Sequence, residues 1–359
     1  DGLDPLSTED STASDLIATG DGSLILAAVG AINVTDGGDS DSIGIDAAGA
    51  GNILLQTTVG GITIESAAAV QADSGHISLL SGAGVVQQSG GNLFTTGGTI
   101  DVEAFGGAIV MDNLSVALTD EGLGGNIRYA ATGDITLGAL LAGTGDISVL
   151  SSGGSILDGG DAFVEVSGNG LRLSAASAVG ILSPTNPIET SVTNLSVSSG
   201  SGGISILETD DITITSVEVT VNRVSPTADV SGQTDVEQSD LVTTSAGSIV
   251  LVTSDGSITV EDGTGPGDGK GIDADTAGNI LIRANGFEQD ISLNAGVVTG
   301  SGAITLIASD SILSGVGGDV ISGSGDINLR AVNGSALMVD GVLVQTAGGA
   351  NINFEAGEG

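Results

Sequence analysis

A five-residue word, Gly-x-Ile-x-Leu or Gly-x-Ile-x-Val, recurs along the chain and restricts the folds open to it. It appears as Gly51-Asn-Ile-Leu-Leu, Gly75-His-Ile-Ser-Leu and Gly98-Thr-Ile-Asp-Val, and again from Gly278 and Gly302. Apolar residues alternate within each word, which is typical of a short strand with one buried face. Gly, Ser, Asn or Asp end each run, so we expect strands of about four or five residues.

The spacing of these words predicts the architecture. Ile53 and Ile77 lie 24 residues apart, Ile77 and Ile100 lie 23 apart, and Ile280 and Ile304 again lie 24 apart. One or two further apolar runs lie between successive words. A coil of about 24 residues with two or three short strands is one turn of a parallel β-helix. We therefore predict an all-β solenoid of about 15 coils, which makes a rod on the order of 70 Å long.

A longer repeat lies on top of the short one. The segment Asp15-Leu-Ile-Ala-Thr pairs with Asp240-Leu-Val-Thr-Thr, and all such matches are offset by 225 to 229 residues. The chain is therefore interpreted as one unit of about 227 residues, 1–226, followed by a truncated second copy, 227–359. We expect it to be a window from a longer tandem array.

One region breaks the short period. An irregular excursion near 214–226 carries the alternating run Val217-Glu-Val-Thr-Val, and a polar stretch follows as far as Asp240. We expect a strand that leaves the regular coil, and then a loop at the boundary between the units.

The composition excludes several classes of partner. Six Lys and Arg residues stand against 45 Asp and Glu, a formal net charge of -39. Such a chain repels nucleic acids and anionic lipid surfaces, which are bound through cationic side chains. No apolar stretch approaches the roughly 20 residues that span a bilayer, so membrane insertion is not expected. The chain has no Cys, so repetition, ions or length must supply its stability.

The residues that could carry catalysis have structural interpretations. Polysaccharide-cleaving β-helices need paired carboxylates, or a carboxylate with Arg or Lys. Here the carboxylates fall at repeated turn positions and cations are scarce. His76, the single His, occupies a turn position that other words fill with Asn, Asp or Ser. We expect the Asx residues at this position to bond nearby backbone groups and to form a ladder along the rod. No catalytic residue and no enzyme activity are predicted.

Calcium is the one cofactor for which the sequence offers candidates. Two acidic, Gly-punctuated loops occupy equivalent places in the two units, and hard cations take several oxygen ligands from such turns. Neither loop has EF-hand or calcium-binding β-roll spacing. Solvated acidic loops are the alternative interpretation. The candidate ligands are Asp36, Asp39, Asp41, Glu261, Asp262 and Asp268.

With these words laid out, the chain resembles the giant repetitive adhesins of bacterial surfaces, namely the filamentous-haemagglutinin-like and autotransporter-like β-solenoid proteins. The resemblance rests on the Gly-Asn-Ile and Gly-Asp-Ile words, the Gly-rich composition, the lack of Cys and the nested repeat. It implies a right-handed β-helix, secretion to the cell surface, and a role in adhesion, coats or filaments.

The sequence thus predicts a non-enzymatic extracellular rod with a structural or adhesive role. A self-assembling filament or sheath subunit is the alternative, and a polysaccharide-active β-helix enzyme is a second one. Open solenoid ends expose unpaired strand edges. The expected partners are therefore further repeats of the same polypeptide or identical copies, together with a surface glycan or a protein receptor.

Overall fold

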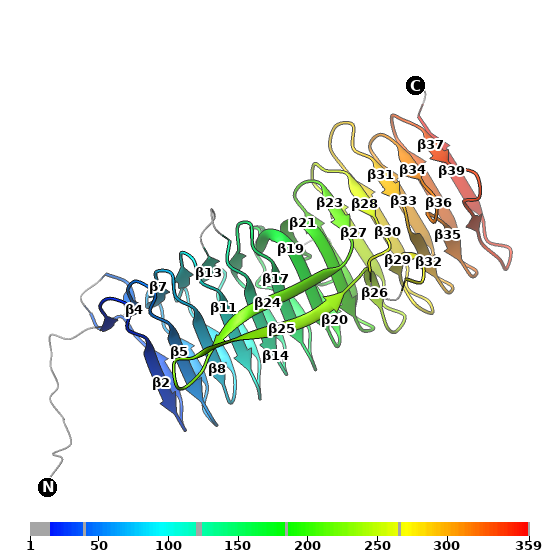
Figure 1. Ribbon diagram of the computed structural model, residues 1–359. Helices are drawn as coiled ribbons and strands as arrows, with labels where there is room; N and C mark the ends of the chain where they lie inside the picture. Colours follow the sequence, from blue (N-terminus) through cyan, green and yellow to red (C-terminus); the bar gives the residue numbers. More distant parts are fainter. Residues whose placement is uncertain (1–14, 39–40, 120–123, 184–185, 265–266, 358–359) are drawn as a thin grey trace, which may run out of the picture.

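The computed structural model describes residues 15–38, 41–119, 124–183, 186–264 and 267–357 of the 359 residues. Within these ranges every regular element is a strand, and parallel strands stack as a β-solenoid of about 13 turns (Figure 1). No helix among the described residues is long and apolar enough to span a bilayer. The predicted all-β solenoid with coils of about 24 residues is confirmed.

Three parallel ladders run the length of the rod, and each coil contributes one strand to each of them. The first ladder comprises β2 (Leu24–Ala28), β5 (Ile53–Thr57), β8 (Ile77–Ser81), β11 (Ile100–Ala104), β14 (Ile127–Ala131), β17 (Ile147–Ser151), β19 (Val166–Ala175), β21 (Ile188–Ser199), β26 (Leu241–Thr243), β29 (Lys270–Asp273), β32 (Gly296–Thr299), β35 (Val320–Ser322) and β38 (Val344–Gln345). The second comprises β3 (Ile32–Val34), β6 (Ile62–Ile64), β9 (Val85–Gln87), β12 (Ile109–Met111), β15 (Ile135–Leu137), β18 (Ile156–Asp158), β20 (Ala178–Val179), β22 (Gly203–Glu208), β27 (Ile249–Thr253), β30 (Ile280–Ala284), β33 (Ile304–Ala308), β36 (Ile327–Ala331) and β39 (Ile352–Ala356). The third comprises β1 (Leu16–Ala18), β4 (Ile43–Ala47), β7 (Ala69–Ala72), β10 (Leu93–Thr95), β13 (Val116–Thr119), β16 (Ala139–Leu141), the long strands β19 and β21 again, β23 (Ile212–Ile214), β28 (Ile258–Val260), β31 (Ile291–Leu293), β34 (Ile312–Ser314) and β37 (Ala336–Met338).

The core is a set of apolar rows, because each coil places the same residue type over its predecessor. Ile53 pairs with Ile77, Ile77 with Ile100, and Ile100 with Ile127, and all four are fully buried. The interior is narrow, so Ile, Leu, Val and Ala fill it without aromatic volume. The exception is Tyr129, whose hydroxyl donates to Gln87 Oε1 at 2.7 Å.

The Gly that opens each word is required where successive coils approach most closely. A Cβ on Gly75 would collide with the carbonyl oxygen of Gly51, one on Gly98 with that of Gly75, and one on Gly125 with that of Gly98. The same contact recurs at Gly302, over Gly278. The Gly of the word therefore leaves room for the backbone of the coil beneath it.

The predicted Asx ladder is present, and its bonds run between coils. Asn52 Oδ1 accepts from the backbone N–H of His76 at 2.8 Å, and Asn126 Oδ1 accepts from that of Asp146 at 2.8 Å. Asn279 repeats the bond in the second copy, to Ala303 N at 2.8 Å. His76 is a member of this ladder, because its Nδ1 lies 3.0 Å from the N–H of Thr99. The turn interpretation of His76 is confirmed.

The second copy of the long repeat is turned by one ladder relative to the first. By sequence, β27 is the counterpart of β2, yet β2 lies in the first ladder and β27 in the second. Likewise β3 lies in the second ladder and its counterpart β28 in the third. A unit therefore spans a whole number of coils plus about one third of a coil.

The excursion near 214–226 differs from its prediction in one respect. The expected strand exists as β24 (Val217–Val224), but the polar stretch after it forms a second strand, β25 (Val230–Gln238), where a loop was predicted. The two strands make an antiparallel hairpin apart from the ladders, and the proposed unit boundary at 226/227 lies in its turn. Because this hairpin adds no coil, and residues 1–14 lie outside the described part, the rod has about 13 coils where the spacing predicted about 15.

We predict that Gly98→Ala destabilises the rod by about 1–3 kcal/mol, since the new methyl group meets the carbonyl oxygen of Gly75. Urea unfolding followed by circular dichroism measures the change. Gly97→Ala is the matched control, because a Cβ there makes only an ordinary contact of 3.5 Å with Ser74. Equal effects of the two substitutions would contradict this explanation of the word.

Candidate functional site

The hairpin β24–β25, called the strap below, is the largest departure from the repeating coil. It leaves the rod after β23 and runs back toward the N-terminal coils, across the outer face of the first ladder (Figure 1). Its residues reach β8, whose Ser78 Oγ accepts from the Val224 N–H at 2.9 Å. Segments more than 140 residues apart in sequence thus lie against each other.

Apolar contacts fasten both ends of the strap. Val217, Val219 and Val221 of β24 are buried, whereas Glu218 and Thr220 between them are exposed. At the far end Val224 packs with Leu54 and Leu80, and all three are buried. These two leucines project outward from their strands, so the strap shields apolar side chains that would otherwise face water.

Beneath the middle of the strap lies a buried ionic network. Arg128 of β14 contacts Asp101 at 3.0 Å, Glu103 at 2.9 Å and Asp235 of the strap at 2.9 Å. Arg223 of the strap contacts Asp101 at 2.6 Å and also pairs with Glu103. Arg128 is only 4% exposed and Asp101 fully buried. The network therefore joins both strands of the strap to two coils of the rod.

The network balances its charge. A third guanidinium, that of Arg172, donates to the carbonyl oxygen of Val236 at 3.0 Å and lies near the charge of Asp235, so three arginines accompany the three carboxylates. Burial alone would lower the pKa of Arg128, but the carboxylates of Asp101, Asp235 and Glu103 together raise it. Three of the five arginines in the chain are therefore committed to holding the strap.

His76 also lies under the strap. Its Nε2 is 3.2 Å from the side-chain amide of Asn222, and the N–H of Asn222 donates to Thr99 Oγ1 at 2.8 Å. Burial lowers the pKa of His76, so its ring is neutral at physiological pH. The position is structural, since the neutral ring links a turn of the rod to the strap.

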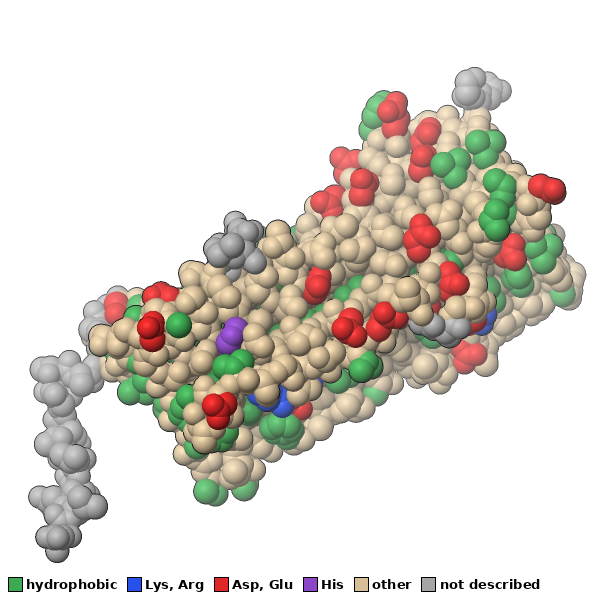
Figure 2. Space-filling view, in the orientation of Figure 1, with side chains coloured by type: hydrophobic (Ala, Val, Ile, Leu, Met, Phe, Trp, Pro, Cys, Tyr) green, Lys and Arg blue, Asp and Glu red, His purple; other side chains and the backbone are tan. Residues whose placement is uncertain are grey.

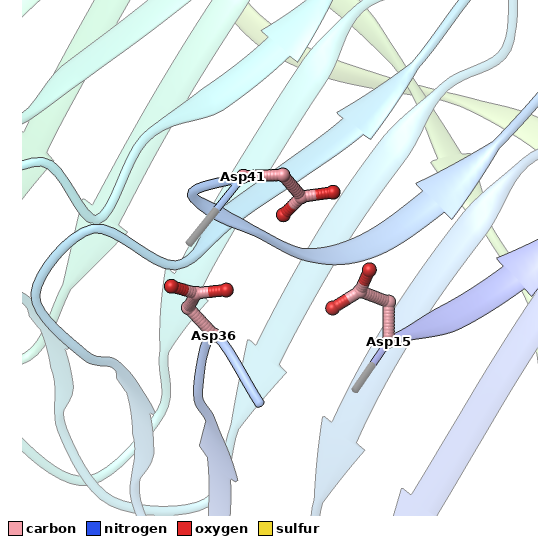
Figure 3. Close-up of side chains that lie close together, drawn as sticks. All are labelled: Asp15, Asp36 and Asp41. Atoms are coloured by element: carbon pink, nitrogen blue, oxygen red, sulfur yellow. The ribbon is translucent and has the colours of Figure 1, made fainter. Parts of the chain in front are cut away.

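The first calcium loop brings three carboxylates together. Asp15 precedes β1, Asp36 follows β3 and Asp41 precedes β4, and one carboxylate oxygen of each lies within 4.8 Å of the others (Figure 3). Asp41 Oδ1 also accepts from the Ile43 N–H at 2.9 Å. Two of the predicted candidates thus meet, with Asp15 as a third partner that the prediction did not name. The remaining candidate in this loop, Asp39, lies outside the described residues.

The second loop occupies the equivalent place, but its described acids form no such group of three within 4.8 Å, and it contains a cation. Burial raises the pKa of Asp240, the counterpart of Asp15, and the nearby charges of Asp262 and Asp268 raise it further. Lys270 Nζ lies 3.6 Å from Asp268 and 2.7 Å from Asp273, at a position that is Ile43 in the first copy. The ammonium group partly neutralises this loop.

Glu261, the remaining candidate of the second loop, contacts a neighbouring coil. Its Oε1 accepts from Asn294 Nδ2 at 2.8 Å, so the side chain bridges to the next coil. The sequence prediction did not include Asp15 and Asp240. The signal that could have identified them is the match between the two segments that begin with these residues. Each of these segments opens with an Asp directly before a strand, β1 in the first copy and β26 in the second.

Comparison of the chain with protein-family models, with curated proteins and with solved structures finds no match.

We predict that Arg128→Ala costs about 3–5 kcal/mol, because it leaves Asp101 and Asp235 buried without their shared cation. Urea unfolding gives the loss, and hydrogen exchange of residues 217–238 tests whether the strap detaches. The control is Arg330→Ala, which removes an exposed pair with Glu355 and should cost about 0–1 kcal/mol. Unchanged protection of the strap in Arg128→Ala would contradict its proposed anchoring.

For the first loop we predict that Ca²⁺ slows hydrogen exchange in β1 and β4, because the ion would bridge carboxylates from both sides of the turn. Asp36→Asn combined with Asp41→Asn should abolish this protection. Asp262→Asn with Asp268→Asn is the matched control in the second loop and should leave it unchanged. A result reproduced by NaCl of equal ionic strength would mean screening of solvated carboxylates and no calcium site.

Proposed function

We propose that the chain is a non-enzymatic extracellular rod with a structural or adhesive role, from a large repetitive bacterial surface protein of the filamentous-haemagglutinin-like or autotransporter-like kind. The observation that carries the proposal is the continuity of the three parallel ladders through about 13 coils. Each coil adds roughly 4.8 Å, so the described part is a rod of about 60 Å. A scaffold of this kind holds its two ends apart at a fixed distance.

The stiffness of such a rod comes from two repeated interactions. Backbone hydrogen bonds of the ladders run along the rod axis, so bending would stretch them on one side. The buried rows of Ile, Leu and Val resist separation of coils, because separation would expose apolar surface. The strap adds a third restraint, since it joins β8, β11 and β14 to the later coil from which it emerges.

The surface charge suits an extracellular spacer. Asp and Glu side chains are scattered over the face seen in Figure 2, and few Lys or Arg side chains reach it. Like charges on neighbouring rods repel, which keeps the rods soluble and separate. The same charge disfavours binding to nucleic acid or anionic lipid.

The last described coil leaves a strand edge that fits the rod and the filament alternative equally. Ile352 and Phe354 of β39 are 41% and 48% exposed, and β39 pairs on one side only, with β36. A further coil stacked on β39 would bury these side chains and complete its hydrogen bonds. That coil can belong to another repeat of the same polypeptide or to an identical copy.

The enzyme alternative is less well supported by the hollows of the described surface. An apolar groove of about 400 Å³ is lined by Leu182, Leu207, Val250 and Leu281 among others, with no titratable side chain. A wider hollow over β9 and β12, of about 730 Å³, contains one carboxylate, that of Asp112. Neither lining offers the paired carboxylates that glycoside cleavage uses.

We predict that electron micrographs of the purified chain show separate rods of about 60 Å at low concentration, as expected of a spacer with about 13 coils. Rods joined end to end, in numbers that grow with protein concentration, would favour the filament. Compact particles without a rod shape would contradict both. Cleavage of any member of an acidic and neutral polysaccharide panel would overturn the non-enzymatic assignment.

A further inference from the structure

A third group of carboxylates, apart from both predicted loops, lies at one corner of the rod between the second and third ladders. Asp158 ends β18, and Glu165 directly precedes β19 in the same coil. Glu189 of β21 lies one coil further on, over Glu165, because Val166 pairs with Thr190. Two consecutive coils thus bring three acids to one place.

The three side chains face each other inside the protein. One carboxylate oxygen of each lies within 4.8 Å of the other two. Asp158 is 7% exposed, Glu165 4% and Glu189 9%, so each is more than nine-tenths buried. Surface acids that merely share a region of solvent would show much greater exposure.

The hydrogen bonds of the group are incomplete. Asp158 Oδ1 accepts from the Gly160 N–H at 2.8 Å, and Glu165 Oε2 accepts from the Glu189 N–H at 2.7 Å. Asp158 Oδ2 and Glu189 Oε2 are buried and accept no hydrogen bond from the described residues. Buried carboxylate oxygens without partners are strongly unfavourable, and a bound cation would satisfy both of them.

The described part of the chain supplies no cation here. No Lys, Arg or His among the described residues forms an ion pair with Asp158, Glu165 or Glu189, in contrast to Arg128 and Arg223 under the strap. Burial raises the pKa of Glu165 to about 9 and raises that of Glu189 above its ordinary value.

We propose that Asp158, Glu165 and Glu189 form a buried binding site for a hard divalent cation, and that Ca²⁺ is the ion that fits. All the donors are carboxylate oxygens, which calcium prefers, and no nitrogen or sulfur ligand is present to select zinc or copper. Two oxygens at about 2.4 Å from one Ca²⁺ lie at most about 4.8 Å apart, so three oxygens within 4.8 Å of one another can reach the same ion. Mg²⁺ demands a tighter octahedron and keeps several waters.

The ion would join residues from two successive coils, so it would stabilise the stacking of β19 and β21.

The test uses the full chain with Asp36→Asn and Asp41→Asn, which removes the candidate ligands of the first loop. Calorimetric titration with Ca²⁺ should give a saturable binding event. Adding Glu189→Gln should abolish that event. Glu208→Gln is the matched control and should retain it, because Glu208 is equally buried but its oxygens accept from Thr190 Oγ1 and Thr209 N. Absence of the event in the parent, or its persistence in Glu189→Gln, would overturn the proposal.

Stability provides a second readout that separates a metal site from a purely structural one. Ca²⁺ should raise the thermal midpoint of the parent above its value in chelator, because the ion binds only the folded chain. Glu189→Gln should lose this rise, and in chelator it should unfold no earlier than its parent. An earlier unfolding of Glu189→Gln together with no effect of Ca²⁺ on the parent would mean a structural role only.

Discussion

The coil-on-coil hydrogen-bond ladder is the interaction on which the rest of this molecule depends. It places each residue directly over a residue one coil earlier, so whatever occupies a position is repeated against a copy of itself. Apolar residues are stabilised by this arrangement because they pack on one another, as in the row from Ile53 to Ile127. The opening Gly is required where the coils approach most closely, because a Cβ on Gly98 would meet the backbone at Gly75. Asn and Asp are also stabilising at such positions, since a side chain such as that of Asn52 accepts a hydrogen bond from a backbone N–H of the next coil.

Stacking places like charges directly over each other, which is destabilising, and this chain has a net charge of -39. Arg128 and Arg223 neutralise the acids under the strap, with Arg128 shared among Asp101, Glu103 and Asp235. Lys270 partly neutralises the second acidic loop. The corner at Asp158 has neither device and keeps two buried oxygens without partners. Repulsion between the acids is thus relieved by arginines under the strap and by a lysine in the second loop. At the corner a bound cation would relieve it.

The sequence predicted the coil, its length, the Gly and Asx words and the position of the strand β24, because each of these leaves a local or periodic trace. It did not predict β25, in which Val230 and Val236 are the only large apolar residues and whose place depends on pairing with β24. Nor did it predict the ionic network, since Arg128 and Asp235 are 107 residues apart. The group at Asp158 was missed for a related reason. Glu165 and Glu189 meet only because they occupy equivalent positions in successive coils, and neither belongs to a recognisable acidic run.

Comparison of the two copies separates what the ladder requires from what the strap requires. Leu54 and Leu80, which pack against Val224, correspond to Leu281 and Ile307, so the outward apolar residues persist where no strap lies over them in the described part. The charged residues do not persist. The contact of Asp101 with Arg128 corresponds to an amide pair, in which Asn353 Nδ2 donates to Asn328 Oδ1 at 3.0 Å. Because the second copy is also turned by one ladder, equivalent surfaces of the two units face different directions. Repeated from unit to unit, such a turn would distribute any one surface in a spiral around the rod, so that a ligand of that surface could be reached from every side.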